Sequence, residues 1–476
     1  MRPARPVSKK LILAVIDGLG PGLLDRAIAA GAAPTLDWLA AEGARSDRCC
    51  STFPSLTPVC LSALITGRHP DGSLIPSMTW YHRGEGRFVE YGSSIAATLA
   101  EGTRQMLDDV LVNLNMLHLS PQVDTVFERL DDAGLVTAAV NTFVMRGRTR
   151  HPISRPNARR VARRIGIVDA VYGPRRYFLG DLFFTDRTGA PINLGGAVDR
   201  HGGHVGRWLV TRDGFDFLFF YLYETDAVQH RGGDAVAAVA GADRSLELLV
   251  EAAGGRGRFL DRYAVAVVAD HSQSAVEQAV DASEPYADLR LFRGRRRSRP
   301  EDCDLAVAAS NRVAMAYLLP GAQVTLAEIV ERTRASAPAD VVLHLEDGWY
   351  VAWRAGGELR FRRGQGVIDE RGHSYRVEGD RDLLDPALYP GALERIEGLL
   401  ACPRAGDVVV SAAPGIEYRD AGGIHHEGGG SHGSLHAVDS LVPLITAGFE
   451  GHASGLPEVP SITDLTPMAV RHFGLR

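Results

Sequence analysis

The sequence predicts an α/β protein with a doubly wound, mainly parallel sheet and helices on both faces. The prediction depends on three apolar runs, at residues 10–16, 215–223 and 263–269. Each run is short, rich in β-branched or aromatic residues, and followed closely by an aspartate, as expected of strands buried on both faces. Helical stretches separate the runs, and this alternation is typical of a parallel sheet.

The bulk composition excludes several classes of protein. The chain has 476 residues, a hydrophobic fraction of 45% and a net charge of −6, so no nucleic-acid polymer is expected as a partner. Basic runs at residues 159–164 and 294–299 are interpreted as solvated faces. The cysteines are odd in number and lack CxxC spacing, which predicts neither a disulfide framework nor a zinc ribbon. The apolar run at 11–16 is too short for a signal peptide or a transmembrane segment, so a cytoplasmic protein is expected.

The chain is predicted to divide into a core and an insertion. Residues 1–275 and 401–476 are assigned to the α/β core, and residues 276–400 to an inserted α+β subdomain. Core character is expected to return with a strand at 407–411. The elements expected in the insertion are a strand at 313–318, a helix at 326–336 and a hairpin of 341–345 with 349–354 across a Glu-Asp-Gly turn.

A further helix is predicted in the stretch 51–67, after a short extended segment. Thr57 occupies the expected N-cap position, Pro58 the first helical position, and Thr66-Gly67 closes the helix. Two interpretations stay open from this stretch alone. Thr57 is either an ordinary cap or a hydroxyl held at a helix N-terminus, where free N–H groups and the helix dipole favour a phosphate group.

Acidic residues and histidines gather at the predicted strand ends and in a glycine-rich loop. Three aspartates and three histidines of this kind match the ligands of two divalent cations, for which zinc or manganese suits oxygen and imidazole donors. Taken singly, each is more often a helix cap or a surface turn. Their shared position at one sheet edge favours a metal site formed by Asp17, Asp226, His230, Asp270, His271 and His432.

These motifs, in this order, resemble the alkaline phosphatase superfamily, and most closely its nucleotide pyrophosphatase/phosphodiesterase branch, the type I phosphodiesterases. The resemblance extends from residue 17 to about residue 445. The residues that carry it are Asp17, Thr57-Pro58, Thr66-Gly67, Asp226-x-x-x-His230, Asp270-His271 and His432-Gly433 before the apolar run 442–445.

The resemblance implies an alkaline-phosphatase-like fold and a two-metal phosphohydrolase. The expected reaction is cleavage of phosphodiester or pyrophosphate bonds in a small phosphate ester or nucleotide-like substrate, through a phospho-threonine at Thr57. One metal ion would be held by Asp226, His230 and His432. The other would be held by Asp17, Asp270 and His271, with the Thr57 oxygen completing its ligands. Zinc is expected, with manganese as the alternative.

Substrate recognition departs from the family pattern. In this branch an asparagine on the loop after the nucleophile helix contacts a non-bridging phosphate oxygen, but residues 74–81 contain no asparagine, so Ser77 or Thr79 is the expected substitute. Trp80 would either stack on a base or pack in the core. Arg148 and Arg150 would either contact an anionic substituent or form an exposed basic loop.

Two alternatives to the phosphodiesterase hypothesis stay open. The first is a phosphomonoesterase, a phosphonate hydrolase or a head-group phosphotransferase of the same superfamily. The second is a catalytically silent metal-binding scaffold.

Overall fold

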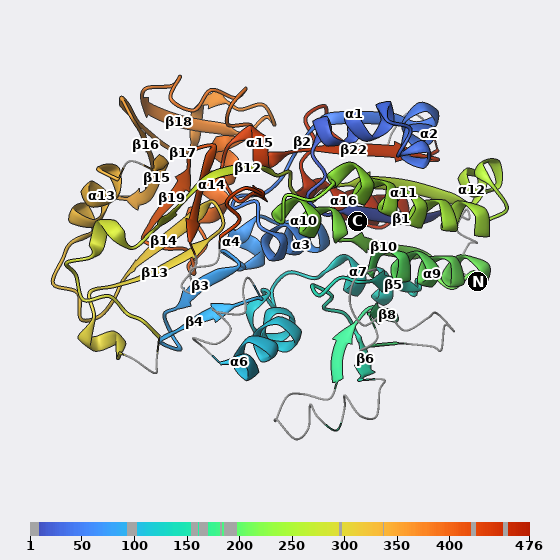
Figure 1. The fold of residues 1–476 in the computed structure, drawn as a ribbon, viewed down its shortest axis with the longest axis horizontal. Helices are drawn as coiled ribbons and strands as arrows, with labels where there is room; N and C mark the ends of the chain where they lie inside the picture. The colour runs from blue at the N-terminus through green and yellow to red at the C-terminus, as the bar shows by residue number, and fades with distance from the viewer. Residues whose placement is uncertain are drawn as a thin grey trace.

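The computed structural model describes residues 9–92, 102–153, 160, 170–180, 183–184, 198–294, 298–336, 338–419, 425–450 and 456–476. Most of the arginines in the two basic runs, including Arg163 and Arg295, lie outside these residues. Two large sheets lie side by side, one covered by helices and the other mostly antiparallel (Figure 1). Among the described residues, no helix is both long and apolar enough to cross a membrane.

The larger sheet has eight strands and confirms the predicted fold class. Its five central strands, β11, β1, β10, β5 and β8, are parallel, whereas β2, β22 and β9 join the edges in antiparallel pairing. Three of the central strands, β1, β10 and β11, are the predicted apolar runs, and all six residues of β10 and of β11 are buried. The strands, in spatial order, are β2 (Ala44–Cys50), β22 (Leu441–Ala447), β11 (Tyr263–Val268), β1 (Lys10–Ile16), β10 (Phe217–Leu222), β5 (Thr137–Val140), β8 (Arg176–Leu179) and β9 (Phe183–Phe184).

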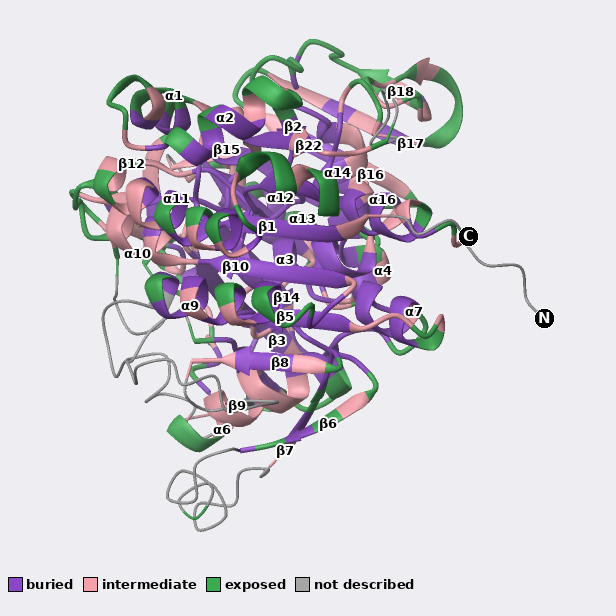
Figure 2. Cartoon of the chain, turned by 90° about the vertical axis from the view of Figure 1, so that its right-hand side faces the viewer, coloured by how far each residue is buried: buried purple, intermediate pink, exposed green. Residues whose placement is uncertain are grey.

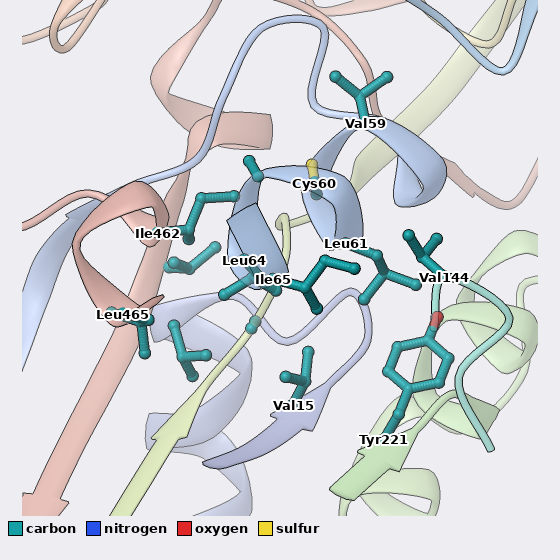
Figure 3. Close-up of a cluster of buried hydrophobic side chains, with 14 of the residues drawn as sticks. Val15, Val59, Cys60, Leu61, Leu64, Ile65, Val144, Tyr221, Ile462 and Leu465 are labelled. Carbon is teal, nitrogen blue, oxygen red and sulfur yellow. The ribbon is translucent and has the colours of Figure 1, made fainter. Parts of the chain in front are cut away.

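Two groups of helices cover this sheet, and the strands between them are buried whereas exposed residues lie at the periphery (Figure 2). One group is α1 (Pro21–Ala29), α2 (Pro34–Glu42), α9 (Val198–Thr211) and α11 (Ala235–Ala252). The other is α3 (Thr57–Thr66), α7 (Val126–Asp132) and α16 (Leu465–His472). Every residue of α3 is buried, and Leu61, Leu64 and Ile65 lie among Val15, Tyr221 and Leu465 (Figure 3).

The second sheet has seven antiparallel strands in the order β13-β14-β19-β15-β16-β17-β18. The predicted hairpin is present as β15 and β16, and its turn residues Asp347 and Gly348 both have positive φ, at +49° and +76°. These values are typical of a type I′ turn. The strands are β13 (Leu305–Ser310), β14 (Val313–Leu318), β15 (Ala339–Glu346), β16 (Trp349–Arg354), β17 (Gly357–Ile368), β18 (Ser374–Gly379) and β19 (Val408–Ala412), with helices α13 (Leu326–Arg334) and α14 (Ala392–Leu400).

One strand differs from its predicted placement. The strand expected to return to the core at 407–411 is β19, and it lies between β14 and β15 in the second sheet. All five of its residues are buried. A buried strand has the same apolar pattern in either sheet, so the sequence could not show which strands β19 pairs with. The limits of the two predicted units otherwise remain a prediction.

A small three-stranded sheet joins the two large ones. It consists of β12 (Ser274–Asp281), which leaves the core after β11, flanked by β20 (Gly415–Arg419) and β21 (Gly430–Ser431). Further elements of the chain are α4 (Pro70–Ser73), β3 (Thr79–His82), β4 (Arg87–Glu90), α6 (Thr103–Asp108), the π-helix η1 (Asp109–His118), β6 (Thr149–Pro152), β7 (Ala170–Gly173), α10 (Glu224–His230), α12 (Arg256–Arg262) and α15 (Ala437–Ser440).

Candidate active site

The polar residues predicted at the strand ends lie together at one edge of the eight-stranded sheet. In the register of the parallel strands, Ile16 of β1 pairs with Leu222 of β10, and Val15 pairs with Val268 of β11. The carboxyl ends of the three strands therefore coincide, at the edge where α/β sheets bind ligands. The residues brought together there are Asp17, Asp226, His230, Asp270, His271 and His432.

The first group is centred on Asp226. Asp226 and His230 are one turn apart on α10, and His432 directly follows β21. The Oδ1 atom of Asp226 lies 3.3 Å from His230 Nε2 and 3.6 Å from His432 Nε2. Close approach of β1 to α10 explains Gly18, which has φ +68° and where an added Cβ would lie 3.1 Å from Asp226 Cα.

The second group is Asp17, Asp270 and His271. The Nε2 atom of His271 lies 3.3 Å from Asp17 Oδ1 and 3.5 Å from Asp270 Oδ2. The other carboxylate oxygens are occupied: Asp17 Oδ2 accepts a hydrogen bond from the Tyr221 hydroxyl, and Asp270 Oδ1 accepts the His271 N–H at 3.0 Å. The oxygens that face His271 are thus the ones left for a ligand.

All three histidines present the same ring nitrogen to the carboxylates. Their Nδ1 atoms face backbone carbonyl oxygens, at 2.7 Å from Gly430 for His230, 3.2 Å from Ser272 for His271 and 2.7 Å from Ser55 for His432. Such a bond places the proton on Nδ1 and leaves the Nε2 lone pair free. This is the usual arrangement of histidines that bind a metal ion.

The electrostatics of the cluster fit a bound cation. Burial, reinforced by repulsion from Asp270 and Asp226, raises the pKa of Asp17, and burial also raises the pKa of Asp270. Burial opposes ionisation of Asp226 as well, but the adjacent His230 holds the pKa of Asp226 well below its usual range. Asp17 Oδ1 and Asp270 Oδ2 are buried and, in the described part of the chain, lack a hydrogen-bond partner. Divalent ions would supply the missing partners, and the oxygen and imidazole donors match their chemistry.

Thr57 lies beside the second group. Its Oγ1 atom is 3.3 Å from His271 Nε2, and its side chain is buried. The predicted N-cap role is wrong: the N-cap is Leu56, which has extended φ and ψ of −117° and 138°, and Thr57 is the first helical residue. The predicted helix end holds, because Gly67 closes α3 with φ +69°. Because the Thr57 hydroxyl does not cap the helix, it is available to the cluster of candidate metal ligands.

The predicted substrate contacts on the loop after α3 are engaged elsewhere. The Ser77 hydroxyl donates to Ser310 Oγ at 3.3 Å, and the Thr79 hydroxyl donates to Glu90 at 2.7 Å. Trp80 is fully buried, with His82 and His118 rings 5.2 Å and 5.3 Å from its own. A base can stack on Trp80 only if those rings move, so the structure favours the core interpretation of this residue.

The two predicted arginines are on the protein surface. Arg148 is 46% exposed and pairs with Glu128, Asp132 and Asp124 at 2.8 Å, 3.0 Å and 3.2 Å. Three carboxylates already neutralise its charge, which disfavours a second anion there. Arg150 is an exposed residue of β6.

Three residues that the sequence analysis did not single out contact the cluster. Tyr221 donates to Asp17, Gln273 donates to Asp226 Oδ1, and Asn311 Nδ2 lies 3.0 Å from His432 Nε2. Tyr221 is hidden in the sequence because it belongs to a continuous apolar strand. Asn311 has only the signature of a turn residue between two apolar strands.

Two other clusters of possible metal ligands occur among the described residues. They are His82 with Glu85 and His118, and Asp369 with His373 and Glu394. In each the glutamate is already paired with an arginine, Glu85 with Arg87 at 2.6 Å and Glu394 with Arg371 at 2.7 Å. The arginine charge competes with a cation for the carboxylate, so the sheet-edge cluster is the better metal site.

Comparison with known proteins agrees with this geometry. The chain matches the family model described as type I phosphodiesterase/nucleotide pyrophosphatase over residues 11–435. No curated protein sequence matches the chain. Among solved structures, the phosphonoacetate hydrolase of Sinorhizobium meliloti 1021, in complex with phosphonoformate, is 18% identical with a TM-score of 0.60, over 99% of this chain and 98% of that chain.

Mammalian proteins show the same fold. Murine ectonucleotide pyrophosphatase/phosphodiesterase 5 is 12% identical with a TM-score of 0.59, over 98% of this chain and 96% of its own. The human protein of the same name is also 12% identical, with a TM-score of 0.56. At these identities the structures establish the fold, and the family match establishes the class. The chain belongs to the type I phosphodiesterase/nucleotide pyrophosphatase family of hydrolases.

Proposed function

We propose that the chain is a two-metal phosphohydrolase that cleaves phosphodiester or pyrophosphate bonds of a small substrate through a phospho-threonine at Thr57. The observation that carries the proposal is the 3.3 Å distance between Thr57 Oγ1 and His271 Nε2, which places a buried hydroxyl against a cluster of six candidate ligands. A threonine hydroxyl is a weak nucleophile by itself. Its position beside this cluster is therefore the feature that makes it a candidate for catalysis.

The ligands divide between two sites. Asp226, His230 and His432 would hold one divalent ion, and Asp17, Asp270 and His271 would hold the other, with Thr57 beside it. Zinc is proposed, with manganese as the alternative, because both accept mixed oxygen and imidazole ligands. The bound ions would supply Lewis acidity, which favours the ionised Thr57 hydroxyl and neutralises charge that develops on the phosphoryl group.

The chain itself would position the Thr57 hydroxyl and the phosphoryl group and surround them with polar groups. The N-terminus of α3 directs the free N–H groups of its first turn at the oxygens of a transferred phosphoryl group. The bond from Thr57 Oγ to phosphorus would form as the bond to the leaving group breaks. Water would then cleave the phospho-threonine and restore the hydroxyl. The burial of Thr57 limits access of bulk water during the first step.

The proposal is tested with a panel of three chromogenic esters and one phosphonate, whose cleavage is followed by release of phosphate, with added Zn²⁺ or Mn²⁺. The panel is bis-p-nitrophenyl phosphate, the p-nitrophenyl ester of thymidine monophosphate, p-nitrophenyl phosphate and phosphonoacetate. Faster turnover of the two diesters than of the monoester is the expected result. Preferential cleavage of p-nitrophenyl phosphate would indicate a phosphomonoesterase, and preferential cleavage of phosphonoacetate would indicate a phosphonate hydrolase. No turnover of any substrate with both metal ions bound would favour the silent scaffold.

A further inference from the structure

Asn311 enters the metal cluster from the second sheet. It lies in the turn between β13 and β14, and its Nδ2 atom is 3.0 Å from His432 Nε2. Since His432 Nδ1 faces the carbonyl oxygen of Ser55, Nε2 is the acceptor and the Asn311 amide is the donor. Among the described residues, a side-chain donor from the second sheet thus reaches a candidate metal ligand of the α/β core.

The turn that carries Asn311 is held on both sides. The Asn311 carbonyl oxygen accepts the N–H of Tyr418 at 2.7 Å, and the next N–H, from Arg312, donates to the His432 carbonyl oxygen at 3.0 Å. Asn311 has φ +51°, in the left-handed region that asparagine tolerates better than most residues. A side chain on such a fixed turn is positioned in advance, as a binding group needs to be.

The same hairpin forms hydrogen bonds with the loop after α3. Ser310 Oγ accepts hydrogen bonds from the Ser77 hydroxyl at 3.3 Å and from the Thr79 N–H at 3.0 Å. Ser77 and Thr79, which were expected to contact the substrate, therefore hold the hairpin against this loop. The Asn311 amide lies beside the cluster instead.

We infer that the Asn311 amide donates a hydrogen bond to a non-bridging oxygen of the substrate phosphoryl group. When His432 Nε2 serves as a metal ligand, its lone pair can no longer accept from Asn311. The amide is then free to donate to another acceptor beside the cluster, and a phosphoryl oxygen bound there provides one. A neutral amide donor stabilises an anionic oxygen without adding a positive charge that would repel the metal ions. This inference rests on the proposed function.

Binding of inorganic phosphate to the metal-loaded protein tests the contact without catalysis. Calorimetry would compare wild type with Asn311→Gly, which relieves the positive φ and removes the amide, and with Asn311→Asp, which keeps the shape but cannot donate when ionised. We expect phosphate affinity to fall by about tenfold to hundredfold in Asn311→Gly, because a hydrogen bond to a charged group is lost. Affinity should fall further in Asn311→Asp, because the ionised carboxylate also repels phosphate. Metal content should stay at the wild-type value.

The matched control is Asp347→Gly, at the positive-φ turn of the β15–β16 hairpin in the same sheet. It should bind phosphate as wild type does. Unchanged phosphate affinity in both Asn311 variants would overturn the inference, and so would loss of a metal ion, which would make Asn311 a residue that holds metal. If diesters are cleaved but the Asn311 variants bind phosphate as tightly as wild type does, only this inference fails. If phosphate binding depends on Asn311 but no ester is cleaved, only the proposed function fails.

A sulfur substitution locates the contact on the substrate. Either non-bridging oxygen of the thymidine monophosphate p-nitrophenyl ester can be replaced by sulfur, which is a poor hydrogen-bond acceptor. We expect the rate loss caused by Asn311→Gly to shrink several-fold for one phosphorothioate diastereomer only. An equal rate loss for the oxygen ester and both diastereomers would show that Asn311 does not contact either oxygen.

Discussion

The imidazole rings of His271 and His432 lie parallel, with centroids 3.6 Å apart and planes inclined by only 10°. Each ring belongs to a different group of candidate ligands, so the two groups are in direct contact. Asp226 adds a second connection, because its carboxylate lies within 4.8 Å of ligand atoms in both groups. The two groups therefore form one continuous cluster rather than two separate sites, and substitution of its candidate ligands should act on metal content and catalysis together.

Loss of one ligand should remove one ion. His432→Ala deletes a neutral nitrogen donor of the first group, and we expect metal content to fall from two ions to one per chain, with loss of at least about 100-fold in kcat/KM. Metal content by mass spectrometry and turnover of a diester would be measured together. His373→Ala, in the cluster where Arg371 already engages Glu394, is the control and should keep both ions. A His432→Ala protein with two tightly bound ions would contradict the ligand assignment.

Removal of the Thr57 hydroxyl should abolish turnover without loss of metal. We expect Thr57→Ala to lower kcat by at least about 1,000-fold, because no other group replaces a nucleophile that forms the intermediate. Thr57→Ser should retain measurable turnover, since it keeps a hydroxyl at the start of α3. Mass spectrometry of protein quenched during turnover should show a phosphoryl adduct on Thr57 in wild type. Full activity of Thr57→Ala would rule out this nucleophile.

Tyr221 is expected to tune the affinity for metal through Asp17. Its hydroxyl donates to Asp17 Oδ2 and lowers the pKa of that carboxyl, against the stronger effect of burial. Tyr221→Phe should raise the Asp17 pKa further and weaken metal affinity by about tenfold to hundredfold at neutral pH. The deficit should shrink at higher pH, where protons compete less. Tyr223→Phe, on the adjacent half-buried tyrosine, is the control, and an equal loss there would show a general packing effect.

Stabilisation by metal should grow with pH. Burial raises the pKa values of Asp17 and Asp270 above the unfolded value of about 3.9, so the metal-free native state holds protons that the unfolded state has released. The metal-free protein therefore loses stability as pH rises through this interval, whereas bound ions relieve the repulsion. We expect the increase in Tm caused by Zn²⁺ over a chelator to grow as the pH rises above about 4. An increase that does not change with pH would contradict protonated carboxyls in the metal-free site.

Asp199, which is not one of the candidate metal ligands, should make the free energy of unfolding depend on pH. It accepts the N–H groups of Tyr223 and Glu224 at 2.9 Å and 3.2 Å, at the start of α10, and burial and the charge of Glu224 raise its pKa to about 7. Because this value exceeds the unfolded one, the contribution of Asp199 becomes unfavourable as pH rises from about 4 to 7, by no more than about 4 kcal/mol.

Asp199→Asn removes this titration. We expect its stability relative to wild type to improve between pH 5 and pH 8, as measured by urea unfolding of the metal-free proteins. Asp234→Asn, at the exposed N-cap of α11, is the control. A difference between Asp199→Asn and wild type that does not change with pH would show that Asp199 does not titrate in this range.

The sequence by itself determined the sheet and the candidate ligands that meet at its edge. Apart from Lys10, the residues of β1, β10 and β11 are apolar and each strand is followed closely by an aspartate, and parallel strands must bring their carboxyl ends to one edge. The order and types of residues around Asp17, Thr57 and His432 were enough to predict the family. These features are local in the chain, so a pattern can reveal them.

Only the tertiary structure decided which groups surround the ligands. The placement of β19 in the second sheet, the burial of Trp80 and the pairing of Arg148 with three carboxylates depend on partners far away in the chain. Asn311 reaches His432 across 121 residues, through a hairpin held by Tyr418 and Ser77. Local patterns encode which residues become buried but not which neighbours they meet. The candidate nucleophile and the candidate metal ligands could therefore be proposed from the sequence, whereas the proposed substrate contact could be found only in the folded protein.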